Sequence, residues 1–93
     1  MGKVEVTLYG ALAKIAGEKI AVVEGSTVKE IVNSLSARYG ERVGKGICDE
    51  EGRLRRFVNI YVNGKDIRFL NQLEAELEEG DKISIVPAVG AVS

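Results

Sequence analysis

The sequence predicts an α+β domain in which a mixed five-stranded sheet packs on one main helix. The chain has 93 residues, which is enough for one domain and no more. Several segments alternate apolar and polar side chains, as half-buried strands do, whereas residues 27–40 carry apolar side chains at helical spacing. We expect the folded domain to span residues 1–87 and residues 88–93 to form a flexible C-terminal tail.

Composition and charge favour a cytoplasmic globular protein. The net charge is −1, with 13 basic and 14 acidic residues, so no overall field favours nucleic acid or an anionic membrane. Cys48 is the only cysteine, which excludes an internal disulfide, and its role, incidental or in sulfur handling, stays open. No apolar run has membrane length. Because histidine is absent, we expect no catalytic residues, no metal site, no cofactor and no enzyme activity of the chain alone.

The first quarter of the chain predicts two paired strands. Residues 3–9 alternate polar and apolar side chains, which is typical of a half-buried strand. A short helix over residues 11–16, closed by Gly17, links this strand to a second one. The link is short, so we expect the two strands to pair antiparallel, with Ile20 and Val22 facing inward.

Residues 27–40 predict the main helix. Thr27 and Glu30 have capping-box spacing, in which the threonine side chain accepts from the third amide and the glutamate reaches back to the first. Gly40 is expected to end the helix in the left-handed conformation. The apolar stripe of this helix consists of Val28, Ile31, Val32, Leu35 and Tyr39.

The second half of the chain begins with an expected loop and hairpin. Residues 41–56 have no clear period, so we expect an exposed loop with one turn near Ile47. Residues 57–63 alternate as a strand does, and the Asn63-Gly64 dipeptide is a strong hairpin signal. The chain should return as a short strand over residues 65–68.

The last predicted elements are a one-turn helix and a final strand. Three leucines at helix-like spacing lie in residues 70–77, before the Gly80 turn. Residues 82–86 alternate, and Pro87 should end this strand because proline cannot donate to a ladder. The first and last strands are expected to lie side by side and parallel. The predicted core consists of Val4, Val6, Leu8, Ile20, Val22, Val28, Ile31, Val32, Leu35, Val58, Ile60, Val62, Leu73, Leu77, Ile83 and Ile85.

The order and spacing of these motifs resemble the β-grasp fold of ubiquitin-like proteins, and within it the MoaD/ThiS-type sulfur carriers. The resemblance is carried by the opening Val4-x-Val6-x-Leu8-Tyr9, the helix start Ser26-Thr27-Val28-Lys29-Glu30, the hairpin Val62-Asn63-Gly64-Lys65-x-Ile67 and the strand Gly80-Asp81-x-Ile83-x-Ile85-x-Pro87. It covers nearly the whole chain, and the chain looks closest to the MoaD branch and the archaeal small modifiers related to it.

The resemblance implies a carrier or protein modifier that acts through its C-terminal carboxylate. In this family an ATP-dependent E1-like enzyme adenylates the terminal glycine. The product becomes a thiocarboxylate that donates sulfur in molybdopterin or thiamin synthesis, or the carboxylate is joined to lysines. The implied partners are the E1-like activating enzyme and an acceptor protein such as the large subunit of molybdopterin synthase.

The C-terminus departs from the family pattern, which ends in Gly-Gly. This chain ends Pro87-Ala88-Val89-Gly90-Ala91-Val92-Ser93. Three interpretations stay open: the last three residues are removed to leave Gly90 terminal, the protein is a divergent member that does not conjugate, or its end has been altered. Gly90 is therefore the candidate for activation or processing.

The outward side of the sheet beside the tail is the candidate surface for partners. We expect Tyr9, Phe57 and Tyr61 to contribute to it, together with Pro87 and Val89. The simpler interpretation is that a small sheet cannot hide every aromatic side chain. The alternative function is a non-conjugating β-grasp interaction module that binds a partner through this face.

Overall fold

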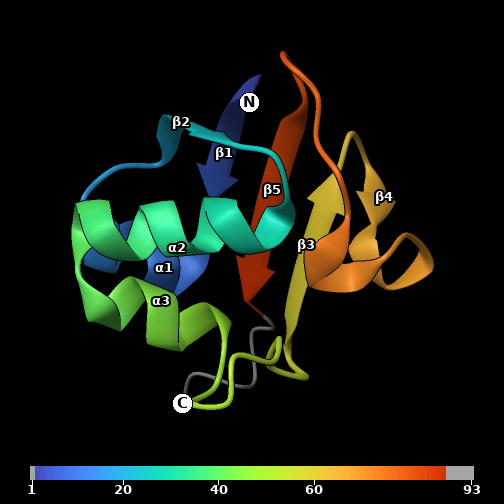
Figure 1. The fold of residues 1–93 in the computed structure, drawn as a ribbon. Coiled ribbons are helices and arrows are strands. Elements are labelled where there is room, and N and C mark those ends of the chain that lie inside the picture. The colour runs from blue at the N-terminus through green and yellow to red at the C-terminus, as the bar shows by residue number, and fades with distance from the viewer. Residues whose placement is uncertain (1, 88–93) are drawn as a thin grey trace.

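The computed structural model describes residues 2–87, which form a five-stranded sheet with the order β2-β1-β5-β3-β4 (Figure 1). The strands are β1 (Gly2–Leu8), β2 (Ile20–Gly25), β3 (Val58–Val62), β4 (Lys65–Asp66) and β5 (Lys82–Pro87). The central strand β5 runs parallel to β1 and antiparallel to β3, while β2 pairs antiparallel with β1. The predicted α+β fold, the antiparallel pairing of the first two strands and the parallel first and last strands are confirmed.

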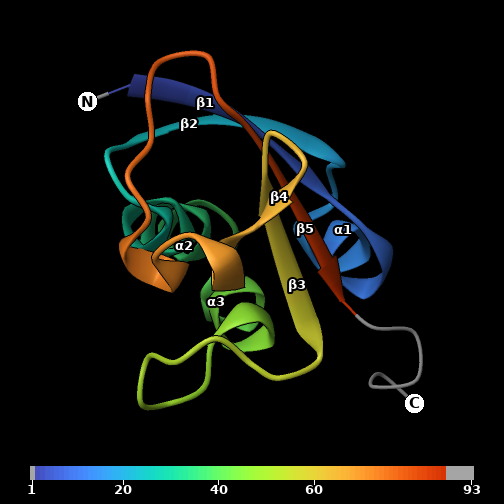
Figure 2. The ribbon, with the colours of Figure 1, turned by 90° about the vertical axis from the view of Figure 1, so that its right-hand side faces the viewer.

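Helices cover the inner face of this sheet. They are α1 (Gly10–Ala16), α2 (Val28–Tyr39) and α3 (Glu41–Ile47). Helices α2 and α3 lie against each other beside the sheet, and α1 contacts α3 and the end of β5 (Figures 1 and 2). No helix within residues 2–87 is long and apolar enough to cross a membrane.

The main helix begins where the capping signal predicts, with one difference in detail. The Glu30 amide donates to Thr27 Oγ1 over 3.3 Å, so Thr27 is the N-cap. The Glu30 carboxylate accepts from the amide of Ser26 over 2.8 Å instead of from the Thr27 amide. This bond and a second one from the Ser26 hydroxyl lower the pKa of Glu30, which therefore stays charged at the positive end of α2.

The expectation of an exposed loop over residues 41–56 is wrong for its first half, which forms α3. Val43 and Ile47 stand one helical turn apart, and both are fully buried. Gly44 and Gly46 interrupt the helical pattern of the sequence, and both stand where another helix packs too closely to leave room for a side chain. A Cβ at Gly44 would lie 2.7 Å from Ser36 Oγ, and one at Gly46 would lie 2.9 Å from Leu12 Cδ2. Gly40 does not adopt the predicted left-handed helical conformation, because its ψ is 165° and α3 starts at the next residue.

The expected inward direction of Ile20 and Val22 is also wrong. Their exposed fractions are 53% and 55%, whereas Ala21 and Val23 are buried. The cause is the pairing register, which sets Val23 opposite the inward Val4 and Ala21 opposite Val6. Directly opposed residues of an antiparallel pair share one face. Because β2 is apolar at four successive positions, its own sequence does not indicate which of its side chains face the core.

The segment between β3 and β5 is more irregular than the sequence predicts. The returning strand β4 has two residues, because the Asp66 side chain accepts from the Arg68 amide and starts a 3₁₀ turn, η1 (Ile67–Phe69). A second 3₁₀ turn, η2 (Gln72–Glu74), replaces the expected single helical turn. Leu77 is buried as predicted, while Leu73 is only partly buried.

Candidate functional site

We call the C-terminal end of β5, at Pro87, the exit, because the C-terminal segment of the chain follows it. Pro87 is the last residue of β5 and pairs with Val58. Both neighbouring strands stop at this level. β1 ends at Leu8, and α1 begins at Gly10. Val58 is the first residue of β3. Its backbone amide donates a hydrogen bond to the Arg55 carbonyl over 3.1 Å, and this bond closes the turn that precedes the strand. Among residues 2–87, neither β1 nor β3 therefore extends past the level of Pro87 (Figure 1).

The backbone of Pro87 fits this position. The Tyr9 amide donates to the Ile85 carbonyl over 3.2 Å, so odd-numbered residues of β5 direct their backbone groups toward β1. Pro87 thus turns its nitrogen, which has no hydrogen, to the place where β1 has given way to α1. Gly10 lies there with a φ of +58°, and a Cβ at Gly10 would be 3.3 Å from Pro87 Cγ. The absence of a side chain at Gly10 makes room for the proline ring.

Two of the predicted surface residues flank this exit. Tyr9 directly follows the last residues of β1 and is 38% exposed, and Phe57 directly precedes β3 and is 42% exposed. Tyr61 is half-buried on the outward side of β3. Val89 and Gly90, the other predicted site residues, lie outside the residues that the structure describes.

The structure adds two residues to this surface that sequence reasoning placed in the core. Tyr61 is opposite Ser84, Ser84 is opposite Thr7, and Thr7 is opposite Ile20. This row crosses the sheet on its outer face and ends in the exposed Ile20, with Val22 as the next outward residue of β2. We call this side, with Tyr9 and Phe57 at its exit end, the outer face. The signal for Ile20 and Val22 lies in the register with β1 and not in β2 itself.

In the charged loop after α3, acidic and basic side chains pair with one another. The Asp49 carboxylate accepts from the amides of Arg53 and Glu51 over 3.0 and 2.9 Å. The hydrogen bond from the Arg53 amide is the main cause that lowers the pKa of Asp49. The Arg53 side chain pairs with Asp49 and Glu51. The loop thus gives no concentrated basic patch for a nucleic acid.

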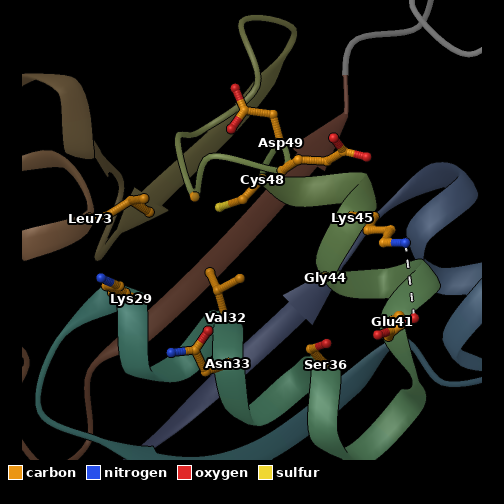
Figure 3. A pocket seen from close by; sticks show the side chains of 12 residues that line it. Lys29, Val32, Asn33, Ser36, Glu41, Gly44, Lys45, Cys48, Asp49 and Leu73 are labelled. Carbon is orange, nitrogen blue, oxygen red and sulfur yellow. Dashed lines mark ion pairs between the residues drawn. The ribbon is translucent and has the colours of Figure 1, made fainter.

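A shallow hollow of about 300 Å³ lies between α2, α3 and this loop (Figure 3). Cys48 lines it together with Lys29, Val32 and Asn33, and the Glu41–Lys45 ion pair stands at its edge. Burial, followed by the charge of Asp49, raises the pKa of the Cys48 thiol, so the thiol is neutral at pH 7 and a poor nucleophile. Among residues 2–87 no three His, Cys, Asp or Glu side chains are grouped to hold a metal ion. The chemistry of this region therefore supports neither a catalytic thiol nor a metal centre.

Comparison with family models gives one match that spans most of the chain. The model described as the ThiS family matches residues 6–90. The match ends at Gly90, the residue that sequence analysis selected as the candidate for activation or processing.

Individual proteins show the same relation. The sulfur carrier protein CysO of Mycobacterium tuberculosis is 37% identical over 75 residues, which are 78% of this chain and 80% of CysO. The solution structure of small archaeal modifier protein 1 from Methanosarcina acetivorans superposes with a TM-score of 0.85 at 32% identity, covering 98% of this chain and 97% of that one. A chain in the crystal structure of the Amycolatopsis orientalis BexX/CysO complex gives a TM-score of 0.83 at 39% identity, covering 92% and 96%.

Proposed function

Since this chain belongs to the ThiS family of ubiquitin-like sulfur carriers, we propose that it carries sulfur as a thiocarboxylate on Gly90. The observation that carries the proposal is the family match, which covers residues 6–90 and ends at this glycine. The solved structures of M. tuberculosis CysO and of the M. acetivorans small archaeal modifier protein 1 share this fold over nearly their whole length. The chain is a ubiquitin-like carrier or modifier, and its terminus is the reacting group.

The exit geometry supports the use of the terminus. An activating enzyme must take the chain end into a narrow channel, which favours an extended segment with small side chains. The residues after Pro87 are Ala, Val, Gly, Ala, Val and Ser, so none is charged or aromatic. Within residues 2–87, β1 ends and β3 begins close to the level of Pro87, so the described neighbours of β5 do not run past that residue.

The proposed chemistry proceeds in three steps. Hydrolysis of the bond after Gly90 removes residues 91–93 and exposes the glycine carboxylate. An E1-like enzyme then joins this carboxylate to the α-phosphate of ATP, and pyrophosphate leaves. Hydrosulfide, or a persulfide followed by reduction with a thiol, attacks the acyl carbon and AMP leaves, so that sulfur replaces one carboxylate oxygen.

The outer face is the proposed docking surface for the activating enzyme and for the acceptor. Tyr9 and Phe57 flank the exit, and Tyr61 continues the surface along β3. We include Pro87 and Val89, through which the terminus would be led to the enzyme. The acceptor is a synthase-type protein such as the large subunit of molybdopterin synthase. The related CysO of A. orientalis has been crystallised in complex with a second protein, BexX.

Intact mass spectrometry of three forms tests the proposal. The forms comprise residues 1–93, 1–90 and 1–87, each incubated with the native activating enzyme, ATP and sulfide. We expect the 1–90 form to gain the mass difference between sulfur and oxygen, the 1–87 form to stay unchanged and the 1–93 form to react only after loss of residues 91–93. Omission of ATP is the control. A 1–90 form that remains unmodified under these conditions would contradict the carrier function.

The departure from Gly-Gly at the terminus favours one second candidate, the non-conjugating interaction module. Under that function the 1–87 form binds the native partner as tightly as the full chain, and Phe57→Ala or Tyr61→Ala weakens binding. Loss of binding in the 1–87 form, with the outer face intact, would instead favour the carrier.

A further inference from the structure

One side of β3 lacks a strand neighbour over part of its length. β4 pairs only with Tyr61 and Val62, at the hairpin end of β3. Val58 to Ile60 lie beyond the reach of β4 and form the free edge of the sheet on this side within residues 2–87. Backbone groups at such an edge need partners from side chains or from water. This part of β3 is also the part that pairs with the exit end of β5.

The Arg68 guanidinium donates hydrogen bonds to this free edge, where a neighbouring strand would otherwise donate them. Its Nη2 donates to the Val58 carbonyl over 2.9 Å and to the Arg56 carbonyl over 3.3 Å. Its Nη1 donates to Asn59 Oδ1 over 2.8 Å. The planar fork of an arginine side chain suits three acceptors spread along an edge.

Arg68 is itself held in place from the other side. Asp66 Oδ1 accepts from the Arg68 amide over 2.8 Å, and Asp66 Oδ2 lies 3.6 Å from Arg68 Nη1. These contacts fix the backbone of η1 and the direction of the arginine side chain together. The exposed fractions of the Arg68 and Asp66 side chains are 35% and 21%, so the pair is shielded from much of the solvent.

We propose that Arg68 is a positioning residue that fixes Phe57 beside the chain exit for recognition by the activating enzyme. The carbonyls of Arg56 and Val58 stand on either side of Phe57, so bonds to both define the backbone at this aromatic residue. Val58 in turn pairs with Pro87. Arg68 thereby sets the position of an exposed aromatic ring relative to the start of the terminal segment. The inference rests on the proposed function, because it concerns the docking step of that activation.

Steady-state adenylation of the 1–90 form tests this role. The variants are Arg68→Gln, Arg68→Lys and the matched control Arg53→Gln, an exposed arginine of the neighbouring loop. We expect both Arg68 variants to raise KM for the carrier by about tenfold, because ordering the segment around Phe57 on binding would then cost a free energy comparable to one charge-assisted hydrogen bond. The value of kcat and the behaviour of the control should stay unchanged. Amide exchange of residues 57–60 should become faster while α2 keeps its protection.

The lysine variant separates positioning from direct contact with the partner. Lysine keeps the charge but cannot donate along the edge as a fork, so its KM should resemble that of the glutamine variant. A wild-type KM for Arg68→Lys, or unchanged amide exchange at residues 57–60, would overturn the proposal. Asp66→Asn loosens only the anchor of Arg68 and provides a milder variant if Arg68→Gln fails to fold. Failure of the wild-type 1–90 form to be adenylated would refute the proposed function as a whole, whereas a normal wild type with unaffected variants refutes this inference alone.

Discussion

The two ends of β5 are held in opposite ways. At its start, Asp81 Oδ1 accepts from Asn63 Nδ2 over 3.0 Å, and Asp81 Oδ2 accepts from the Glu78 amide over 2.8 Å. The Lys82 amide donates to Asn63 Oδ1 over 3.0 Å. At its other end, Pro87 sits where the neighbouring strands stop. The side-chain hydrogen bonds thus gather at the start of the strand, whereas the exit end is held by its pairing with β3 and by the bond from the Tyr9 amide to the Ile85 carbonyl.

The start of β5 is also joined to β1. The Gly80 amide donates to the Lys3 carbonyl over 2.9 Å, and the Lys3 amide donates to Glu79 Oε1 over 2.9 Å. The Glu5 amide donates to the Asp81 carbonyl over 3.1 Å. The hydrogen bonds at the start of β5 therefore reach both Asn63 and the first residues of β1. This comparison predicts that stability depends on the start of β5 and activation on its end.

The largest expected effect on stability comes from the start of β5. Asp81→Ala removes two hydrogen bonds and leaves the side-chain Nδ2 of Asn63 without its acceptor. We therefore expect the free energy of unfolding to fall by about 2 kcal/mol. Urea denaturation followed by circular dichroism measures this change. Glu74→Ala, at an exposed position of η2, is the control and should have little effect. Equal urea midpoints for Asp81→Ala and Glu74→Ala would contradict the expectation that stability depends on the start of β5.

A smaller effect is expected at the exit end, where a pair of glycines offers a matched comparison. Gly10 and Gly17 have φ values of +58° and +77°, so alanine at either position should cost about 1 kcal/mol of conformational strain. Only at Gly10 would the new Cβ press on the Pro87 ring, because nothing lies within 4 Å of the corresponding point at Gly17. We therefore expect similar losses of stability but slower adenylation of the 1–90 form in Gly10→Ala alone. Equal adenylation rates in the two variants would show that the packing of Pro87 does not affect presentation of the terminus.

The smallest expected effect concerns Cys48, which the proposed activation does not use. Because burial raises the pKa of this thiol, its alkylation by iodoacetamide at pH 7 should be slower than in the urea-unfolded chain. The rate should rise at a higher pH in the folded protein than in the unfolded one, since only the thiolate reacts. Cys48→Ser should leave adenylation unchanged. Rapid alkylation of the folded protein at pH 7, or a loss of adenylation in the serine variant, would give the thiol a function.

Local sequence signals predicted the elements that depend on local causes. The N-cap at Thr27 and the Asn63-Gly64 hairpin act through neighbouring residues, and both form as expected. The facing of Ile20 and Val22 was not predictable from β2, because pairing with β1 determines it. The site shows the same division. Tyr9 and Phe57 were recognisable as outward aromatic residues, whereas no pattern around a single arginine in an irregular segment indicates its bonds to β3.

The bonds made by Arg68 also bear on how the protein behaves at high concentration. An uncovered strand edge is a template on which another chain can add a strand, and this is a common start of aggregation. The Val58 carbonyl already accepts a hydrogen bond from the Arg68 side chain, so it is not available to the amide of an incoming strand. Arg68 thereby lowers the tendency of β3 to pair edge to edge with a strand of a second molecule.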